Sequence, residues 1–249
     1  MAAPAETCAI AVMAKAPQPG RSKTRLVPSL STDEAAALAG AFLRDITENI
    51  VLAARAMPIE AYAAYAPAGA EALFEPHLAP GTRLVLADGS GPVADGVNGF
   101  GRCLWQAAHT LHAMGNGAFA LLNSDGPTLP VSVLRHAVEL LLAPGERIVF
   151  GPADDGGYYL IGMKQAHAHL FADIAWSTDT VARRTRARIA ALGLDLAELP
   201  PWYDVDDEPS LRRLVAEVAT PSDDRHVPHT ARLVAEFGLA QRLAETTPA

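Results

Sequence analysis

The fold class of this chain is decided by the stretch Cys8-Ala-Ile-Ala-Val-Met-Ala-Lys-Ala-Pro-Gln-Pro-Gly-Arg-Ser-Lys-Thr-Arg-Leu26. Its first residues, 8 to 13, form an apolar run that is typical of a buried strand, and the remainder is a turn rich in proline and glycine. A helix is predicted to follow, because Ser31 and Glu34 have the spacing of a capping box. Strand, glycine turn and helix in this order are typical of α/β proteins that hold phosphates.

The turn carries a local cluster of positive charge, made up of Lys15, Arg21, Lys23 and Arg25. The chain as a whole is acidic, with a formal net charge of -8, so the cluster indicates an anion site rather than a bias of composition. Gly20 lets the backbone come close to an anion. The alternative interpretation is a solvated loop. A Walker P-loop does not fit, because Pro17 and Ser22 replace its two glycines.

Composition predicts one large domain over residues 1–249, with 220–249 as a C-terminal helical extension. The chain has 249 residues, of which 50% are hydrophobic and 19% charged. Its acidic balance argues against a nucleic-acid partner. Cys8 and Cys103 are expected to be small buried side chains. We also expect a cytoplasmic protein without a membrane partner, because no signal peptide precedes the first strand and no apolar run reaches about 18 residues.

Strand and helix patterns alternate along the chain, which predicts an α/β fold with a mostly parallel sheet covered on both faces. The predicted strands are 8–13, 59–65, 83–87, 119–123, 147–150, 158–163 and 194–199. The predicted helices begin after Ser31 and at Asp207, and cover 70–78, 100–114, 131–142, 178–192 and 229–244. Two neighbouring strands without a helix between them, 147–150 and 158–163, predict an antiparallel pair. Ser177 or Thr178 is expected to cap the helix 178–192. The histidines show no metal-ligand spacing.

The motif Asn123-Ser-Asp-Gly-Pro-Thr-Leu129 places a carboxylate, Asp125, at the end of an apolar strand. In open α/β sheets, ligands bind beyond the carboxyl ends of the strands. Asp125 is therefore well placed to hold Mg²⁺, although an aspartate that caps the following turn or helix has the same sequence signature.

Two later motifs are also acidic. Gly151 to Gly162 contains Asp155-Gly156-Gly157-Tyr158, in which the glycines let an acceptor approach and Asp155 could orient a hydroxyl; the alternative is a plain hairpin turn. In Asp204-Val-Asp-Asp207, alternation points Asp204 and Asp206 the same way if the segment is extended. Asp206 or Asp207 could equally cap the next helix.

Taken in order, these motifs resemble one known family. They are Lys-x-Pro-x-Pro-Gly-x-x-Lys-Thr-Arg-Leu, Ser-Asp-x-Pro-x-Leu, Gly-Pro-x-x-Asp-Gly-Gly-Tyr-Tyr-Leu-Ile-Gly and Asp-Val-Asp, and they span about residues 8 to 215. The chain is similar to the DUF2064 family, a group of glycosyltransferases of the GT-A type. Its N-terminal stretch also resembles 2-phospholactate guanylyltransferase. The chain departs from the family pattern at 99–104, where Gly-Phe-Gly-Arg-Cys-Leu stands in place of Asp-Leu-Gly-x-Arg-Leu.

The resemblance implies a Rossmann-like GT-A fold that binds a nucleotide and Mg²⁺ or Mn²⁺. It implies that the basic turn holds phosphates, that Asp125 and Asp206 hold the metal, and that Asp155 and Gly156, Gly157 and Tyr158 face the acceptor. The expected activity is transfer of a sugar from a nucleotide-diphospho-sugar to a small-molecule acceptor. One alternative is nucleotidyl transfer from a triphosphate, which the four cations of the turn favour. The other is a nucleotide-binding protein without catalysis.

Overall fold

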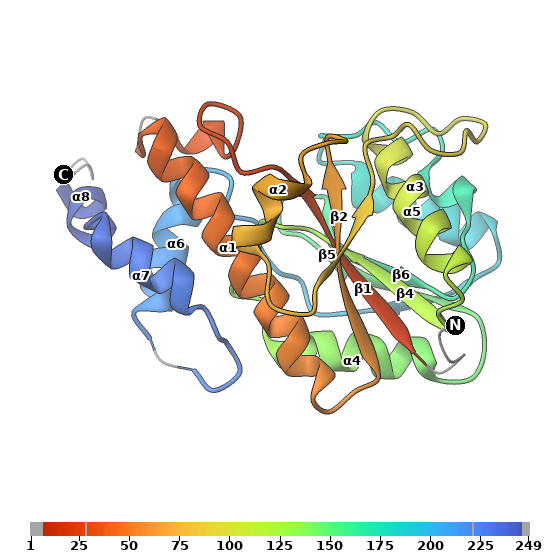
Figure 1. Ribbon diagram of the computed structural model, residues 1–249. Coiled ribbons are helices and arrows are strands. Elements are labelled where there is room, and N and C mark those ends of the chain that lie inside the picture. Colours follow the sequence, from red (N-terminus) through yellow and green to blue (C-terminus); the bar gives the residue numbers. More distant parts are fainter. Residues whose placement is uncertain (1–6, 28, 221, 246–249) are drawn as a thin grey trace.

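A seven-stranded sheet forms the centre of the computed structural model, which describes residues 7–27, 29–220 and 222–245. The strands are β1 (Cys8–Lys15), β2 (Ile59–Ala66), β3 (Arg83–Leu86), β4 (Ala118–Leu122), β5 (Arg147–Pro152), β6 (Tyr158–Met163) and β7 (Asp195–Glu198). Their order is β3-β2-β1-β4-β6-β5-β7. Figure 1 shows the sheet with the helices that flank it. All pairs are parallel except those that β6 makes with β4 and β5. The predicted antiparallel pair is confirmed, and β6 is its reversed strand.

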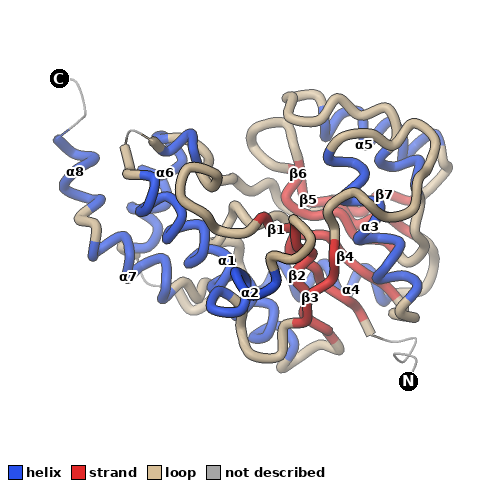
Figure 2. The backbone as a smooth tube through the Cα atoms, turned by 45° about the horizontal axis from the view of Figure 1, so that its top comes forward, coloured by secondary structure: helices blue, strands red, loops and turns tan. Residues whose placement is uncertain are grey.

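Helices cover both faces of the sheet (Figure 2). They are α1 (Thr32–Ala54), α2 (Glu71–Phe74), α3 (Phe100–Ala113), α4 (Val131–Leu142), α5 (Val181–Ala191), α6 (Glu208–Val218), α7 (Pro228–Glu236) and α8 (Leu239–Glu245), with short 3-10 helices η1 (Thr24–Leu26), η2 (Glu75–His77) and η3 (Ala168–Phe171). In β1, Ile10 and Val12 join the core on the α1 and α4 side, while Ala9 and Ala11 face α3 and α5. Burial on both faces explains why β1 is an unbroken apolar run.

The first helix begins where its capping box predicts. The Ser31 hydroxyl accepts a hydrogen bond from the Glu34 backbone N–H at 3.2 Å, and the Glu34 carboxylate accepts one from the Ser31 N–H at 2.8 Å. Leu38 and Phe42 on this helix are fully buried against the sheet. The start of α1 therefore limits the basic turn to the residues between β1 and Ser31, at one edge of the sheet.

Two expectations about helix ends are wrong. The predicted helix 229–244 is two helices, α7 and α8, because the chain turns at Gly238, which has a φ of 60°. Neither Ser177 nor Thr178 caps α5: its N-cap is Thr180, without a side-chain hydrogen bond. The Thr178 hydroxyl instead donates to the Ala175 carbonyl oxygen at 2.7 Å, which stabilises the preceding turn.

Candidate functional site

A cavity of about 440 Å³ opens beyond the carboxyl ends of the parallel strands. Lys15 ends β1, Ala66 ends β2, and Ser124 follows β4, so three neighbouring strands contribute to its wall. Phe100 and Cys103, from the first turn of α3, also line it. Cys103 is therefore only half-buried, contrary to the expectation of a buried side chain. This is the edge at which open α/β sheets bind ligands.

The cavity brings together six of the predicted site residues. They are Lys15, Arg21, Lys23, Arg25, Asp125 and Asp206. Within the described residues, Lys15 and Arg25 form no ion pair, and the guanidinium of Arg21 reaches only the Gln18 side-chain oxygen, at 3.5 Å. Gly20 lies exposed in the same turn with a φ of 72° and does not itself line the cavity. The turn thus presents three cations to the cavity without neutralising them.

Lys23 differs from the other three cations because it is buried and fully paired. Its ammonium donates to a carboxylate oxygen of Asp125, to one of Asp206 at 3.1 Å, and to the Val205 carbonyl oxygen at 2.9 Å. The side chain is 6% exposed, and its nitrogen lies 5.5 Å from the centroid of the Phe42 ring. Burial opposes the charged form, but Asp125 and Asp206 outweigh it and raise the pKa of Lys23. The lysine is therefore an ammonium ion held between two carboxylates.

Backbone contacts hold the two carboxylates on either side of this lysine. The Val205 N–H donates to the Asp125 carbonyl oxygen at 2.9 Å, and this hydrogen bond holds the segment before α6 against the loop that follows β4. The choice between Asp206 and Asp207 as helix cap is also settled here. Asp207 caps α6 by accepting the Ser210 N–H at 2.9 Å, and this leaves the Asp206 side chain free to face the cavity.

Asp204 and Asn123 form a further polar contact, a pairing that the sequence does not indicate. The Asn123 side-chain amide donates to Asp204 at 2.6 Å. Burial raises the pKa of Asp204 to about 7, and the negative charges of Asp125, Asp155 and Asp206 act in the same direction. Alternation in 204–206 does point to Asp204, but nothing in the sequence indicates its partner Asn123, which follows β4.

The residues predicted to face the acceptor lie outside the lining of this cavity. Asp155 is exposed at the β5–β6 turn, where its carboxylate accepts the Gly157 N–H at 2.8 Å. Gly156 is packed against the loop before α5. The ring of Tyr158 packs between Phe150 and Trp176, and its hydroxyl is buried without a partner among the described residues. Of these residues, Asp155 acts electrostatically on Asp204, and the acceptor role of the whole group stays a prediction.

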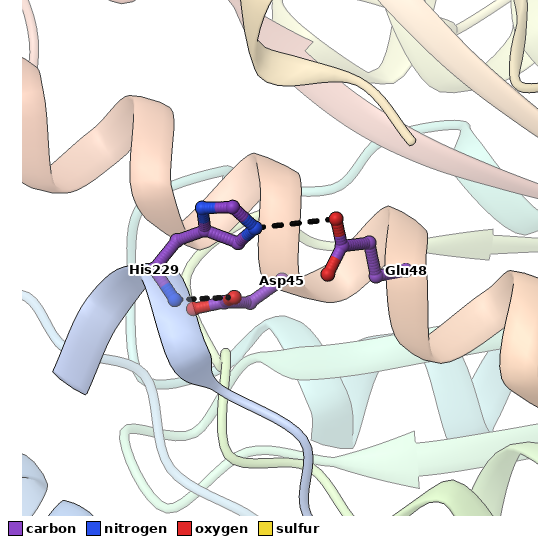
Figure 3. A group of neighbouring side chains, drawn as sticks. All are labelled: Asp45, Glu48 and His229. Carbon is purple, nitrogen blue, oxygen red and sulfur yellow. Dashed lines mark hydrogen bonds and ion pairs between the residues drawn. The ribbon is translucent and has the colours of Figure 1, made fainter. Parts of the chain in front are cut away.

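A second cluster, Asp45, Glu48 and His229, joins α1 to the start of α7 (Figure 3). One ligand atom from each lies within 4.8 Å of the others, so the three could reach one metal ion, which the histidine spacing in the sequence did not indicate. Their hydrogen bonds favour a structural role. Asp45 accepts the backbone N–H groups of His229 and Thr230 at 3.0 and 2.7 Å, and Glu48 accepts from Arg44 at 2.6 Å. We therefore interpret the cluster as a set of hydrogen bonds that caps the start of α7 and joins it to α1.

Replacing Asp45 by alanine is expected to destabilise the protein by about 2 to 4 kcal/mol, because two N–H groups at the start of α7 lose their acceptor. Denaturant unfolding measures this, with the exposed Asp223→Ala as control, expected to stay within about 0.5 kcal/mol. A rise in melting temperature with Zn²⁺ that disappears in His229→Ala would contradict the structural interpretation and establish a metal site.

A mixed, mostly parallel sheet between helical layers, with a cavity lined by charged side chains at its carboxyl edge, defines a Rossmann-like nucleotide-diphospho-sugar transferase fold. A solved protein from Desulfovibrio desulfuricans G20, provisionally described as a nucleotide-diphospho-sugar transferase, is 25% identical with a TM-score of 0.80, over 95% of this chain and 97% of its own. Residues 50–178 match the family described as "Uncharacterized protein conserved in bacteria (DUF2064)", and the chain belongs to that family. The matched segment contains Asp125 and Asp155, whereas Lys23 and Asp206 lie outside it.

More distant structures share the fold alone. A CMP:2-keto-3-deoxy-manno-octonic acid synthetase solved with CTP has 10% identity and a TM-score of 0.53, covering 86% of this chain and 98% of its own. A cytidylyltransferase from Leptospira borgpetersenii serovar Hardjo-bovis (strain JB197) has 11% identity and a TM-score of 0.55, covering 98% and 99%. A comparison with curated proteins gave no match. Among the described residues, no helix combines the length and apolar character needed to cross a membrane.

Proposed function

We propose that this protein is a divalent-metal-dependent transferase that takes a sugar from a nucleotide-diphospho-sugar and transfers it to a small-molecule acceptor. The observation that carries this proposal is the cavity itself, in which unpaired cations face a pair of carboxylates at the sheet edge. The description of the Desulfovibrio protein supports a sugar nucleotide as the donor. Such a reaction needs positioning and charge stabilisation more than covalent chemistry from the protein.

The residues at the carboxylate pair fit a divalent cation. Mg²⁺ and Mn²⁺ prefer oxygen ligands, and Asp125 and Asp206 supply carboxylate oxygens at one point. The ammonium of Lys23 already occupies the position between them as a stand-in cation. Asp125 and Asp206 would hold the metal, and when bound it would neutralise charge on the departing diphosphate.

In the proposed reaction the chain's own residues position the two substrates. Lys15, Arg21 and Arg25 would bind the diphosphate oxygens of the donor. The hydroxyl oxygen of the acceptor would form a bond to the sugar carbon, and Asp155 would accept the proton that this hydroxyl loses. The bond between that carbon and the phosphate oxygen breaks, and the nucleoside diphosphate leaves with the electron pair. The Asp155 loop therefore has to approach the cavity once an acceptor binds.

Nucleotidyl transfer is the second candidate, and the number of cations favours it. Three unpaired cations and Lys23 surround one cavity, which suits the larger charge of a triphosphate. Here an oxygen of the acceptor would attack the α-phosphorus, and pyrophosphate would leave. The two reactions differ in the donor and the leaving group, so a single screen separates them.

The screen combines thermal shift and product analysis on the full chain, with nucleoside triphosphates and nucleotide-diphospho-sugars, each with and without Mg²⁺ or Mn²⁺. Metal-dependent stabilisation by a nucleotide sugar, with slow release of the nucleoside diphosphate, is the expected result. Stabilisation by a triphosphate, with pyrophosphate release on addition of acceptors, would replace it by nucleotidyl transfer. Stabilisation by a nucleotide without product from either donor class would instead support a non-catalytic nucleotide-binding protein. No response to any nucleotide would overturn the proposal.

Removing one exposed cation of the turn is expected to weaken donor binding. Arg25→Met should raise the dissociation constant of the nucleotide found in the screen by about tenfold or more, since a charge-assisted hydrogen bond contributes roughly 1.5 to 3 kcal/mol. Arg55→Met, which removes another exposed arginine, just after α1, serves as control and should leave the constant unchanged. Equal constants for the two variants would place the phosphates elsewhere.

A further inference from the structure

The buried ammonium of Lys23 has no capacity left for a phosphate. A lysine ammonium has three N–H donors, and those of Lys23 are directed to Asp125, Asp206 and the Val205 carbonyl oxygen. Its side chain is 6% exposed, while Lys15, Arg21 and Arg25 are all exposed around the same cavity. In this arrangement Lys23 neutralises the carboxylates and takes no part in holding an anion.

The local backbone also indicates that this lysine is held in place by its partners. Lys23 has a φ of 49°, in the left-handed region of the backbone that residues other than glycine rarely adopt. No side-chain hydrogen bond caps the 3-10 helix η1 that follows it. The Lys23 carbonyl oxygen accepts the Leu26 N–H at 2.9 Å, and the Lys23 side chain is held by the contacts of the ammonium together with the Phe42 ring at 5.5 Å. The placement of the ammonium therefore depends on the two carboxylates.

We propose that Lys23 is a built-in placeholder for the divalent cation: it occupies the point between Asp125 and Asp206 in the ligand-free protein, and leaves it for the phosphates of the nucleotide when the metal enters. This inference rests on the proposed function, because it assigns the same carboxylate pair to the metal. It adds that metal and nucleotide bind cooperatively.

The cooperativity follows from charge. A metal that enters alone has to displace the Lys23 ammonium from its three acceptors, and the displaced ammonium then has no other anionic group in the cavity with which to pair. Phosphate oxygens at the neighbouring cations provide such a group, so a nucleotide lowers the cost of metal entry. By linkage, the metal must then strengthen nucleotide binding by the same factor. The apparent metal requirement of the protein would therefore depend on nucleotide concentration.

The test measures Mn²⁺ affinity by electron paramagnetic resonance in buffer free of phosphate and nucleotide. Lys23→Met is expected to bind Mn²⁺ at least about tenfold more tightly than the wild type, because it removes the competing cation from the carboxylate pair. Lys15→Met is the matched control: it removes a charge from the same cavity but not a contact with either carboxylate, and should change the affinity by less than about threefold. Adding Asp125→Asn to Lys23→Met should abolish the gain.

Equal Mn²⁺ affinity in Lys23→Met and Lys15→Met would overturn the placeholder role, as would a gain that survives Asp125→Asn. Thermal shift gives a second readout in case Lys23→Met is poorly folded. Two unpaired carboxylates should make that variant unstable, and Mn²⁺ should restore it far more than it stabilises the wild type. If instead Lys23→Gln and Lys23→Met stay destabilised at saturating Mn²⁺, the lysine is only structural. Neither readout requires activity, so failure here is distinct from failure of the nucleotide screen.

Discussion

Asp125→Asn is expected to lower turnover of the activated nucleotide by about a thousandfold or more, with little loss of stability. The asparagine keeps the shape of the side chain but removes the charge that would hold the metal against the leaving phosphate, a contribution of the size seen for other transition-state charge contacts. The fold should tolerate the change, because Lys23 keeps Asp206 and the Val205 carbonyl oxygen as acceptors. Product formation and the metal-dependent thermal shift of the protein are both measured with the nucleotide that the screen identifies.

The control for this prediction is Asp223→Asn, which changes an exposed aspartate that does not line the cavity. It should match the wild type in turnover and in thermal shift. If Asp125→Asn keeps a metal-dependent shift with the nucleotide and a turnover within about tenfold of the wild type, Asp125 is not a metal ligand, and the capping interpretation of its motif is the better one.

Gly156→Ala is expected to be the most destabilising single change in the β5–β6 turn, at about 3 kcal/mol or more. Gly156 has a φ of 87°, where a side chain adds about 1 to 2 kcal/mol of strain, and a Cβ atom there would lie 2.3 Å from the backbone oxygen of Asp179. The loop before α5 would have to move to make room for the Cβ atom. A hydrogen bond resists this movement, because the Gly156 carbonyl oxygen accepts the Ala182 N–H, in the first turn of α5, at 2.8 Å. Melting temperature should fall by roughly 6 to 12 °C.

Gly193→Ala is a matched control, because Gly193 has a φ of 66° and stands just beyond the other end of α5, where an added Cβ atom would meet open space. It should show the conformational strain alone, about 1 to 2 kcal/mol. If the two variants lose equal stability, backbone strain explains both, and the close approach of the turn to Asp179 contributes nothing.

Much of the fold could be predicted because its signals are local. The apolar run of β1 and the Ser31–Glu34 box depend on neighbours a few residues apart, and the bounds of α4 and β6 agree with the patterns that predicted them. Where a local signal had a competing local use, the prediction failed: the Thr178 hydroxyl bonds a turn rather than capping α5, and Gly238 divides the last predicted helix.

Local patterns in the chain were enough to predict the class of fold and the residue types of the candidate site: a basic turn after a buried strand, and aspartates in the loops that follow later strands. Which of these side chains meet depends on how the whole chain packs. Lys23 reaches Asp125 and Asp206 across 102 and 183 residues, and in the ligand-free protein this contact pairs its ammonium with carboxylates instead of leaving it open to phosphates. The reason is physical: helix and strand patterns are set by side chains a few positions apart, whereas the closure of long loops onto a shared sheet edge is set by packing of the whole chain.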